Sequence, residues 1–200
     1  MTHRTPLFRG IIVSLLLLTV VGGARAQTDL LEMVPGDCLF CVRVNDMAGS
    51  LAKMDQYLMG VSPMGTAMLV NMQLAGIVGD PTLAGIDMNG TFAVVALSDG
   101  SQGVLVPMTD FDSFVANNPH CTASGEGMAT LAAPNSPMGT FVMASAGGGQ
   151  YAIITPESEK AKLAVLKAAM SSPAVTLQSA LTDEAVNEAG AAPAWAYVNL

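Results

Sequence analysis

Two segments of the chain repeat the same order of apolar and polar positions. Residues 90–107, GTFAVVALSDGSQGVLVP, and residues 139–156, GTFVMASAGGGQYAIITP, align without a gap. Each has a glycine-rich centre between two β-prone runs and closes on Pro, which lacks the N–H that a neighbouring strand needs. Each segment therefore predicts a β-hairpin, and we interpret the pair as an internal duplication.

A helix is predicted after each hairpin. Thr109 is a cap residue after the first, and Thr155 with Pro156 is typical of a helix start after the second. The expected buried faces are Phe111, Phe114 and Val115 in the first helix and Leu163, Leu166 and Met170 in the second. The repeated unit is thus strand, strand, helix, over about residues 90–117 and 139–170.

The rest of the pattern surrounds these units. The other predicted elements are a strand at 37–44, a helix with Met47, Leu51, Met54 and Leu58 on one face, a helix from Ser62-Pro63, a mostly loop region at 118–138 with a short strand near 128–132, a helix at 177–188 and a final strand-like run, AWAYVNL. We predict an α+β domain: an antiparallel sheet built from two β-hairpin-helix repeats and an N-terminal strand, with the helices packed on one face.

The final run carries a second expectation. It stops at the last residue without a closing turn, and like the segment CVRVND it reaches Val-Asn soon after a Pro. We therefore expect the sequence to be the front part of a longer protein.

The first 26 residues have the pattern of an export signal. Arg4 and Arg9 precede the apolar run GIIVSLLLLTVVGG, and Ala24-Arg25-Ala26 is typical of a cleavage site. The alternative is a retained membrane anchor, but the apolar run is shorter than the ~20 residues that a span needs. Cleavage after Ala26 leaves residues 27–200 as one domain, which we expect in the periplasm, in the cell envelope or secreted.

The charge balance limits the partners. The chain has eight basic and sixteen acidic residues, a net charge of −8. Loss of the signal removes Arg4, Arg9 and Arg25, which leaves five basic residues against sixteen acidic ones and a net charge of −11. Nucleic acids and anionic lipids bind through clustered Lys and Arg, so we expect neither, and no membrane span after cleavage. A protein or another envelope ligand remains as the expected partner.

The motif Cys38-x-x-Cys41 raises the question of redox chemistry. In a strand at 37–44, Cys38, Phe40, Val42 and Val44 form a wholly apolar set that should face the core, while Leu39, Cys41 and Arg43 point the other way. Three steps along a strand separate the two Cα atoms by ~10 Å, beyond the ~7 Å limit for a disulfide. We therefore interpret both cysteines as apolar filling, while a bridge from Cys121 to one of them stays open.

Two metal sites are alternatives. Cys38, Cys41, His120 and Cys121 could supply four zinc ligands, although a strand lacks the turn that aims two thiolates at one point. Met64, Met68 and Met72 recur at i, i+4 and i+8 on a predicted helix, and thioethers select Cu(I). Such a methionine row is also typical of adaptable core packing, which we favour.

Catalytic patterns are sparse. Ser50 and Lys53 have the S-x-x-K spacing of penicillin-binding enzymes, but no K-T-G follows. His120 is the one histidine of the mature chain and follows an Asn-Asn-Pro loop. We expect no enzyme activity, no catalytic residues and no cofactor, and an exported hydrolase ranks third among the hypotheses.

Some segments carry a family resemblance. Val34, Pro35, Asp37, the run from Val42 to Asp46 and the run from Val106 to Phe111 resemble motifs of a loosely defined family of bacterial exported proteins. The resemblance implies no established activity and no catalytic residues.

The leading hypothesis is a non-catalytic exported module with a binding or structural role. It predicts an exposed apolar patch or an unpaired sheet edge. The alternative is a soft-metal, copper-binding protein that uses the row Met64, Met68, Met72.

Overall fold

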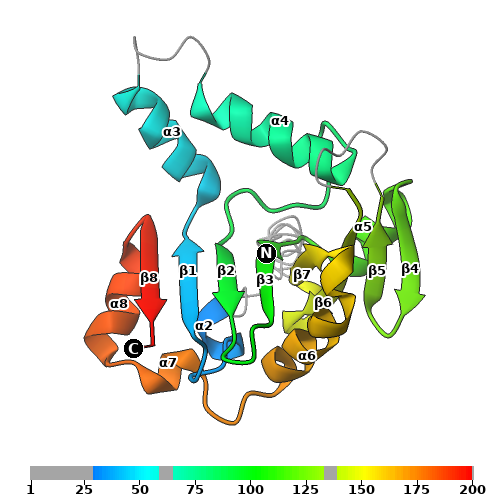
Figure 1. Cartoon of the computed structure of the whole chain (residues 1–200). Coiled ribbons are helices and arrows are strands. Elements are labelled where there is room, and N and C mark those ends of the chain that lie inside the picture. Colours follow the sequence, from blue (N-terminus) through cyan, green and yellow to red (C-terminus); the bar gives the residue numbers. More distant parts are fainter. Residues whose placement is uncertain (1–28, 59–64, 133–138, 200) are drawn as a thin grey trace, which may run out of the picture.

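The computed structural model describes residues 29–58, 65–132 and 139–199, whose strands form one eight-stranded antiparallel sheet (Figure 1). The spatial order of the strands is β4-β5-β6-β7-β3-β2-β1-β8. Their bounds are β1 Phe40–Val44, β2 Phe92–Ala96, β3 Gln102–Pro107, β4 Cys121–Gly125, β5 Met128–Leu131, β6 Phe141–Ala146, β7 Tyr151–Pro156 and β8 Ala194–Val198. The predicted α+β class with an antiparallel sheet is confirmed.

The helices connect the strands. Their bounds are α2 Leu30–Met33, α3 Met47–Tyr57, α4 Thr66–Val78, α5 Phe111–Asn117, α6 Lys160–Ser171, α7 Leu177–Ala180 and α8 Asp183–Ala191, with short 3-10 turns η1 Gly147–Gly149 and η2 Glu157–Glu159. None of the described helices combines the length and the apolar character needed to cross a bilayer. The predicted export signal at 1–26, the helix start at Ser62-Pro63 and Met64 lie outside the described residues.

The order strand, strand, helix occurs twice along the chain, in β2, β3, α5 and in β6, β7, α6. The two hairpins are neighbours, because β3 pairs with β7. Their turns differ by one residue, since Ala96 pairs with Gln102 but Ala146 pairs with Tyr151. A one-residue change reverses the face to which the following side chains point. The hairpins therefore differ in their second strands, and their duplication stays a prediction.

One face of the sheet is covered by α2, α6, α7 and α8. Leu163, Leu166 and Met170 of α6 pack in a core cluster with strand residues such as Leu105 and Ile153. The predicted buried face of α6 is thus confirmed. Fully burying one such side chain contributes roughly 1.5–3 kcal/mol, so this cluster is a main source of stability.

The opposite face is covered over one half by α5. Phe111 and Phe114 of α5 and Val78 at the end of α4 form a second cluster with Val106 of β3 and Met143 of β6. Helices therefore lie on both faces, which corrects the prediction that they pack on one. The reason is that the central strands bury residues on both sides, as β2 and β6 do.

The orientation of β1 is also a correction. Cys41 and Arg43 face the helix-covered core, with 0% and 6% of their surface exposed, whereas Val42 is 39% exposed. The predicted strand at 37–44 begins only at Phe40, and the buried Cys38 lies in the turn before it. The apolar set was assigned to the wrong face because a buried Arg was not expected.

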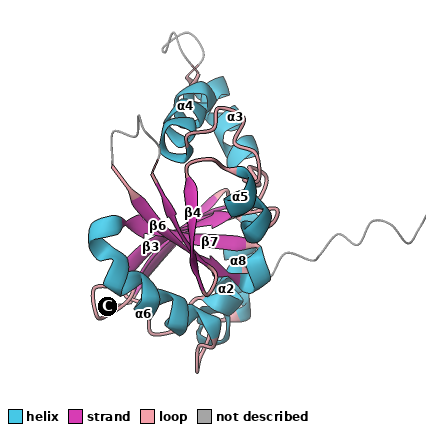
Figure 2. Ribbon diagram, turned by 90° about the vertical axis from the view of Figure 1, so that its right-hand side faces the viewer, coloured by secondary structure: helices cyan, strands magenta, loops and turns pink. Residues whose placement is uncertain are grey.

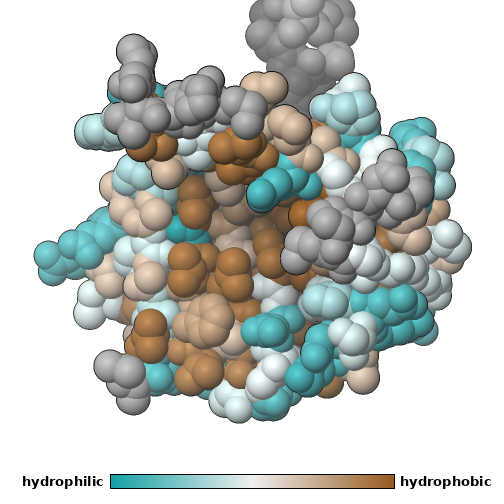
Figure 3. Space-filling model, turned by 45° about the horizontal axis from the view of Figure 1, so that its top comes forward, coloured by the Kyte–Doolittle hydropathy of each residue, from teal (hydrophilic) through white to brown (hydrophobic). Residues whose placement is uncertain are grey.

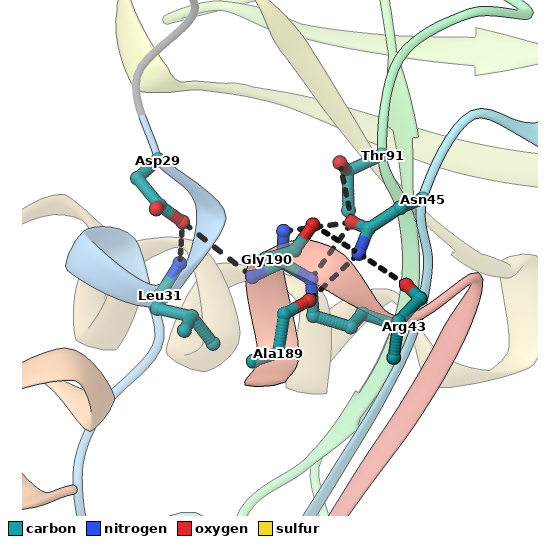
Figure 4. Close-up of polar contacts among 8 residues, drawn as sticks. Asp29, Leu31, Arg43, Asn45, Thr91, Ala189 and Gly190 are labelled. Carbon is teal, nitrogen blue, oxygen red and sulfur yellow. Dashed lines mark hydrogen bonds and ion pairs between the residues drawn. The ribbon is translucent and has the colours of Figure 1, made fainter. Parts of the chain in front are cut away.

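Asn45 explains why Arg43 can be buried (Figure 4). Its Oδ1 accepts hydrogen bonds from Arg43 Nε at 3.0 Å and Nη2 at 2.7 Å, and from Thr91 Oγ1 at 3.0 Å. Its Nδ2 donates to the carbonyls of Ala189 and Ala192 at the end of α8, at 2.7 and 2.8 Å. The Asn45 amide thus links β1 to the residue before β2 and to the end of α8.

Candidate functional site

The cysteines are placed as structural residues. Cys38, Cys41 and Cys121 are free thiols, and the first two are fully buried. Burial, with a smaller contribution from Cys38, raises the pKa of Cys41 to about 12, and burial raises the pKa of Cys38 to about 11. A redox-active cysteine needs a lowered pKa, so these environments disfavour thiolate chemistry.

The four candidate zinc ligands are not brought together. Cys38 and Cys41 belong to the β1 end of the sheet, while His120 and Cys121 lie at β4, the opposite edge. Five strands lie between β1 and β4, which at ~4.8 Å per strand separates them by roughly 29 Å. Neither a shared zinc ion nor a bridge from Cys121 to the pair fits this arrangement.

Ser50 and Lys53 lie on α3. The Ser50 hydroxyl donates to the backbone carbonyl of Asn45 at 3.0 Å, and Lys53 is exposed. The hydroxyl therefore acts as a local support at the start of the helix. His120 lies beside Gly79, and its backbone N–H donates to the Asn118 side chain at 2.9 Å.

An exposed apolar row crosses four strands. Register pairs place Ala196 of β8, Val42 of β1, Val94 of β2 and Val104 of β3 side by side. The three valines are 39–40% exposed, high for valines inside a sheet. The row continues into Ile154 of β7, where the second core cluster and α5 begin. We call the exposed part of this surface, formed by Val42, Val94, Val104, Ala194, Ala196 and Val198, the open face.

A helical hairpin stands at one end of the sheet beside this surface (Figure 2). Asp55 on α3 accepts hydrogen bonds from the backbone N–H groups of Thr66 and Ala67, which begin α4. At the other end of α3, Asp46 caps the helix by accepting from Gly49 N at 2.9 Å. The hairpin is therefore tied together by a carboxylate at the start of α4.

The sequence of α4 is unusual for an exposed helix. Its 13 residues, TAMLVNMQLAGIV, contain no charged side chain, yet only Val78 is fully buried. Met68 and Met72 are 55% and 58% exposed, one turn apart on the helix. Exposed apolar side chains on a helix without any charge are typical of a contact surface, although Asn71 and Gln73 are also exposed on α4.

The open face and the hairpin enclose a hollow. Figure 3 shows apolar residues gathered around it, both on the strands and on the α3–α4 side. Exposed Met54 and Leu58 of the α3 end add to the apolar residues of the hairpin. We call the open face together with the exposed apolar residues of α3 and α4 the apolar surface; it is the candidate functional site.

Two cavities elsewhere are more polar. One of about 460 Å³ lies between the end of α4 and α5 and includes Asp80 and Asn118. Hydrogen bonds from Thr82 lower the pKa of Asp80, and Asn118 donates to the Val78 carbonyl at 3.0 Å. The other, about 850 Å³, lies beside α2, α7 and α8. In the first cavity, Asp80 and Asn118 therefore serve a turn and a helix end.

Comparison of the chain with models of protein families, with curated proteins and with solved structures gives no match.

Proposed function

We propose that this protein is an exported, non-catalytic binding module whose apolar surface receives an apolar segment of a partner protein. The observation that carries the proposal is the exposed row Val42, Val94 and Val104 beside the uncharged, exposed helix α4. Leaving such a surface in water costs free energy, roughly 25 cal/mol per Å², which a partner would recover on binding.

The composition of this surface supports a protein partner. Methionine side chains are flexible and polarisable, so Met68 and Met72 can adapt to partner side chains of different shape. Acidic residues outnumber basic ones two to one along the chain, which favours solubility although an apolar surface is exposed. Export rests on the signal pattern of residues 1–26, which places the partner in the envelope or outside the cell.

We further infer that the two hairpin-helix units descend from one duplicated unit. The gapless alignment of 90–107 with 139–156 supports this, as does the repeated order strand, strand, helix. The one-residue difference between the turns accounts for Val104 lying on the open face while its counterpart Ile153 is buried on the other. We infer that this one-residue difference helped to leave the open face without a covering helix.

A dye test addresses the open face directly. The double variant Val94→Thr, Val104→Thr keeps side-chain shape and β-propensity but makes the row polar. We expect it to bind an apolar fluorescent dye at least threefold less than the wild type. Val165→Thr is the matched control, because Val165 is 47% exposed on α6, away from the surface. Equal dye binding by the wild type and the double variant would contradict the proposal.

Partner capture completes the test. A photo-crosslinking residue at position 94, in protein returned to its native envelope fraction, should give a discrete crosslinked product. The same residue at position 165 should not. Equal products from both positions would indicate non-specific contact and would count against a binding role for the open face.

Soft-metal binding is the second candidate function. Met68 and Met72 are exposed one turn apart on α4, and thioether sulfurs are ligands that Cu(I) prefers. The double variant Met68→Leu, Met72→Leu preserves the apolar surface and removes the ligands. Titration with Cu(I) against a chelator should show tenfold weaker binding in the variant if copper is the ligand. If the variant binds Cu(I) as the wild type does and still binds the dye and the partner, Met68 and Met72 serve as apolar contacts and not as metal ligands.

A further inference from the structure

Strand β8 presents an unpaired edge beside the open face. Among the described strands it pairs with β1 alone. Asn45 N donates to the Pro193 carbonyl and Asn199 N donates to the Leu39 carbonyl, both at 2.9 Å. Hydrogen-bonded pairs recur at every second residue of an antiparallel ladder. The N–H and C=O groups of Ala194, Ala196 and Val198 therefore point away from β1, toward the free edge.

This edge lacks the features that normally prevent strand addition. Natural edge strands carry charges, proline or bulges, which discourage pairing with another chain. The other edge, β4, has an irregular register between Ala123 and Gly125. In contrast, β8 reads AWAYV, without charge or proline, and its five residues pair with β1 in unbroken register. The edge at β8 is therefore the one suited to receive a further strand.

The two sides of β8 differ in chemistry. Ala194, Ala196 and Val198 belong to the open face, whereas Trp195 and Tyr197 pack against the helix-covered core. On that second side α8 contacts β8 (Figure 1) and exposes Asp183, Glu184 and Glu188. No Lys or Arg occurs in the sequence after Lys167, so neither α8 nor β8 carries a basic side chain, and Arg43, which lies opposite Trp195, is buried.

The acidic helix also decides against a second copy as the occupant. Antiparallel pairing of two β8 strands about a two-fold axis keeps both α8 helices on the same face. Their carboxylates would then repel one another across the joint. A strand with basic side chains toward α8 gains attraction instead.

We propose that β8 receives an extended segment of the partner protein in which apolar residues alternate with Lys or Arg. The apolar residues extend the open face, the basic residues face α8, and the backbone pairs with Ala194, Ala196 and Val198. This inference rests on the proposed binding function and names the chemistry of the partner segment.

The test uses a synthetic nine-residue peptide of alternating Val and Lys and the full chain. Trp195 is the only tryptophan and lies in β8, so its fluorescence reports occupancy of this edge. We expect saturable binding that weakens at high salt. A control peptide of the same composition, with all Val residues first and all Lys residues after them, should bind at least tenfold more weakly. Equal affinity for both peptides would show charge attraction alone and overturn the proposal.

Two variants examine the edge itself. Ala196→Pro removes an N–H that points outward, and proline is tolerated at such edge positions. We expect it to weaken peptide binding at least tenfold, whereas Ala196→Val, which keeps both the N–H and an apolar side chain on the open face, should not weaken it. Should the proline variant fail to fold, Glu184→Lys with Glu188→Lys replaces it. That pair should weaken Val-Lys peptide binding and favour a Val-Glu peptide.

The outcomes separate this inference from the proposed function. If Ala196→Pro loses the peptide but still binds the apolar dye, strand addition at β8 is supported. If dye binding depends on Val94 and Val104 but the peptide binds all variants equally, the edge proposal fails and the open-face proposal stands. Concentration-dependent dimers that Ala196→Pro abolishes would identify a second copy as the occupant and overturn the partner chemistry.

Discussion

Asn45 holds several elements through one side chain. It accepts from Arg43 and Thr91 and donates to the end of α8. Replacing Asn45 by Ala leaves the Arg43 guanidinium buried without these acceptors, so we expect the free energy of unfolding to fall by about 2–4 kcal/mol. Urea unfolding measures the change. Asn187→Ala, at an exposed position on α8, is the control and should stay within ~0.5 kcal/mol; equal losses would refute the role of Asn45.

The buried thiols make stability depend on alkaline pH. The pKa values of Cys38 and Cys41 are raised from 9.0 to about 11 and about 12 by burial. Above pH 9 the unfolded thiols ionise while the folded ones stay neutral, so the unfolded state binds fewer protons and stability falls as pH rises. The contribution is complete below pH 9 and is lost between about pH 9 and 12.

Urea unfolding between pH 8 and pH 10 measures this effect. We expect the two thiols together to lower the free energy of unfolding by about 2–3 kcal/mol over the interval, since each can contribute at most about 1.4 kcal/mol per pH unit. The interval avoids most ionisation of Tyr151, whose pKa is raised to about 12 by burial. Burial also raises the pKa of Cys121 to about 11, so Cys38→Ala with Cys41→Ala should reduce the pH dependence without abolishing it. An unchanged slope would show that other groups cause it.

At this scale the sequence predicted the role of the cysteines better than the direction of their strand. Their spacing excluded a disulfide, in agreement with the free thiols. The exposed face of Val42 could not be derived, because burial of Arg43 depends on Asn45 reaching α8, which lies far along the chain. The one signal in the sequence for a buried Arg43 was Asn45, two positions later, whose side chain can accept hydrogen bonds from the guanidinium.

The α3–α4 hairpin should be the least stable described element. Within it only Leu51 and Val78 are fully buried, whereas α6 buries three large side chains. We expect amides of α4 to exchange with deuterium well before those of α6. Asp55→Ala removes the carboxylate at the start of α4 and should speed this exchange several-fold, about 1 kcal/mol of local stability. Mass spectrometry localises the change.

Gln56→Ala is the control for that experiment, because Gln56 is exposed on the same helix. It should leave exchange in α4 unchanged. Equal effects of the two variants, or an Asp55→Ala effect spread over β3 and β7, would mean that Asp55 supports the whole fold.

Elements with strong periodicity were predicted well and those without it were missed. The strands of both hairpins and the strand at 194–198 lie where the pattern placed them. The start of α6 was predicted wrongly: Thr155 and Pro156 complete β7, and α6 begins at Lys160 after the turn η2. Strand β4 was assigned to a loop because CTASG has no large apolar residue and is mostly exposed. The single helix predicted at 177–188 is two, since Thr182 caps α8 through its bond from Ala185 N at 3.3 Å.

An exposed apolar patch or a free sheet edge was expected, but its residues could not be predicted because exposure is a property of the assembled sheet. Val94 and Val104 are typical core residues by type. Their local sequence does not indicate that α5 leaves them uncovered. The uncharged stretch of α4 and the uncharged β8 were visible signals. The lack of charge in α4 and in β8 indicates surfaces on which charge repulsion does not oppose binding to another protein.

For the whole molecule, charge should oppose self-association through the apolar surface. The sequence has an isoelectric point near 4.4. As pH falls from 7 toward that value, repulsion between copies weakens while the exposed valines remain. We expect light scattering to show growing oligomers below about pH 5.5. The Val94→Thr, Val104→Thr variant should resist this and Val165→Thr should not; identical curves would place the association elsewhere.

The pairing of β8 with β1 also governs when the fold can be completed. Arg43 lies opposite Trp195, so this contact joins strands from nearly opposite ends of the described sequence. Contacts between distant residues form slowly, and synthesis delivers β1 long before β8. Until α8 and β8 have been synthesised, β1 has an unpaired flank and Arg43 lacks its link to α8. The free flank of β1 is therefore closed late in folding, after synthesis of most of the described chain.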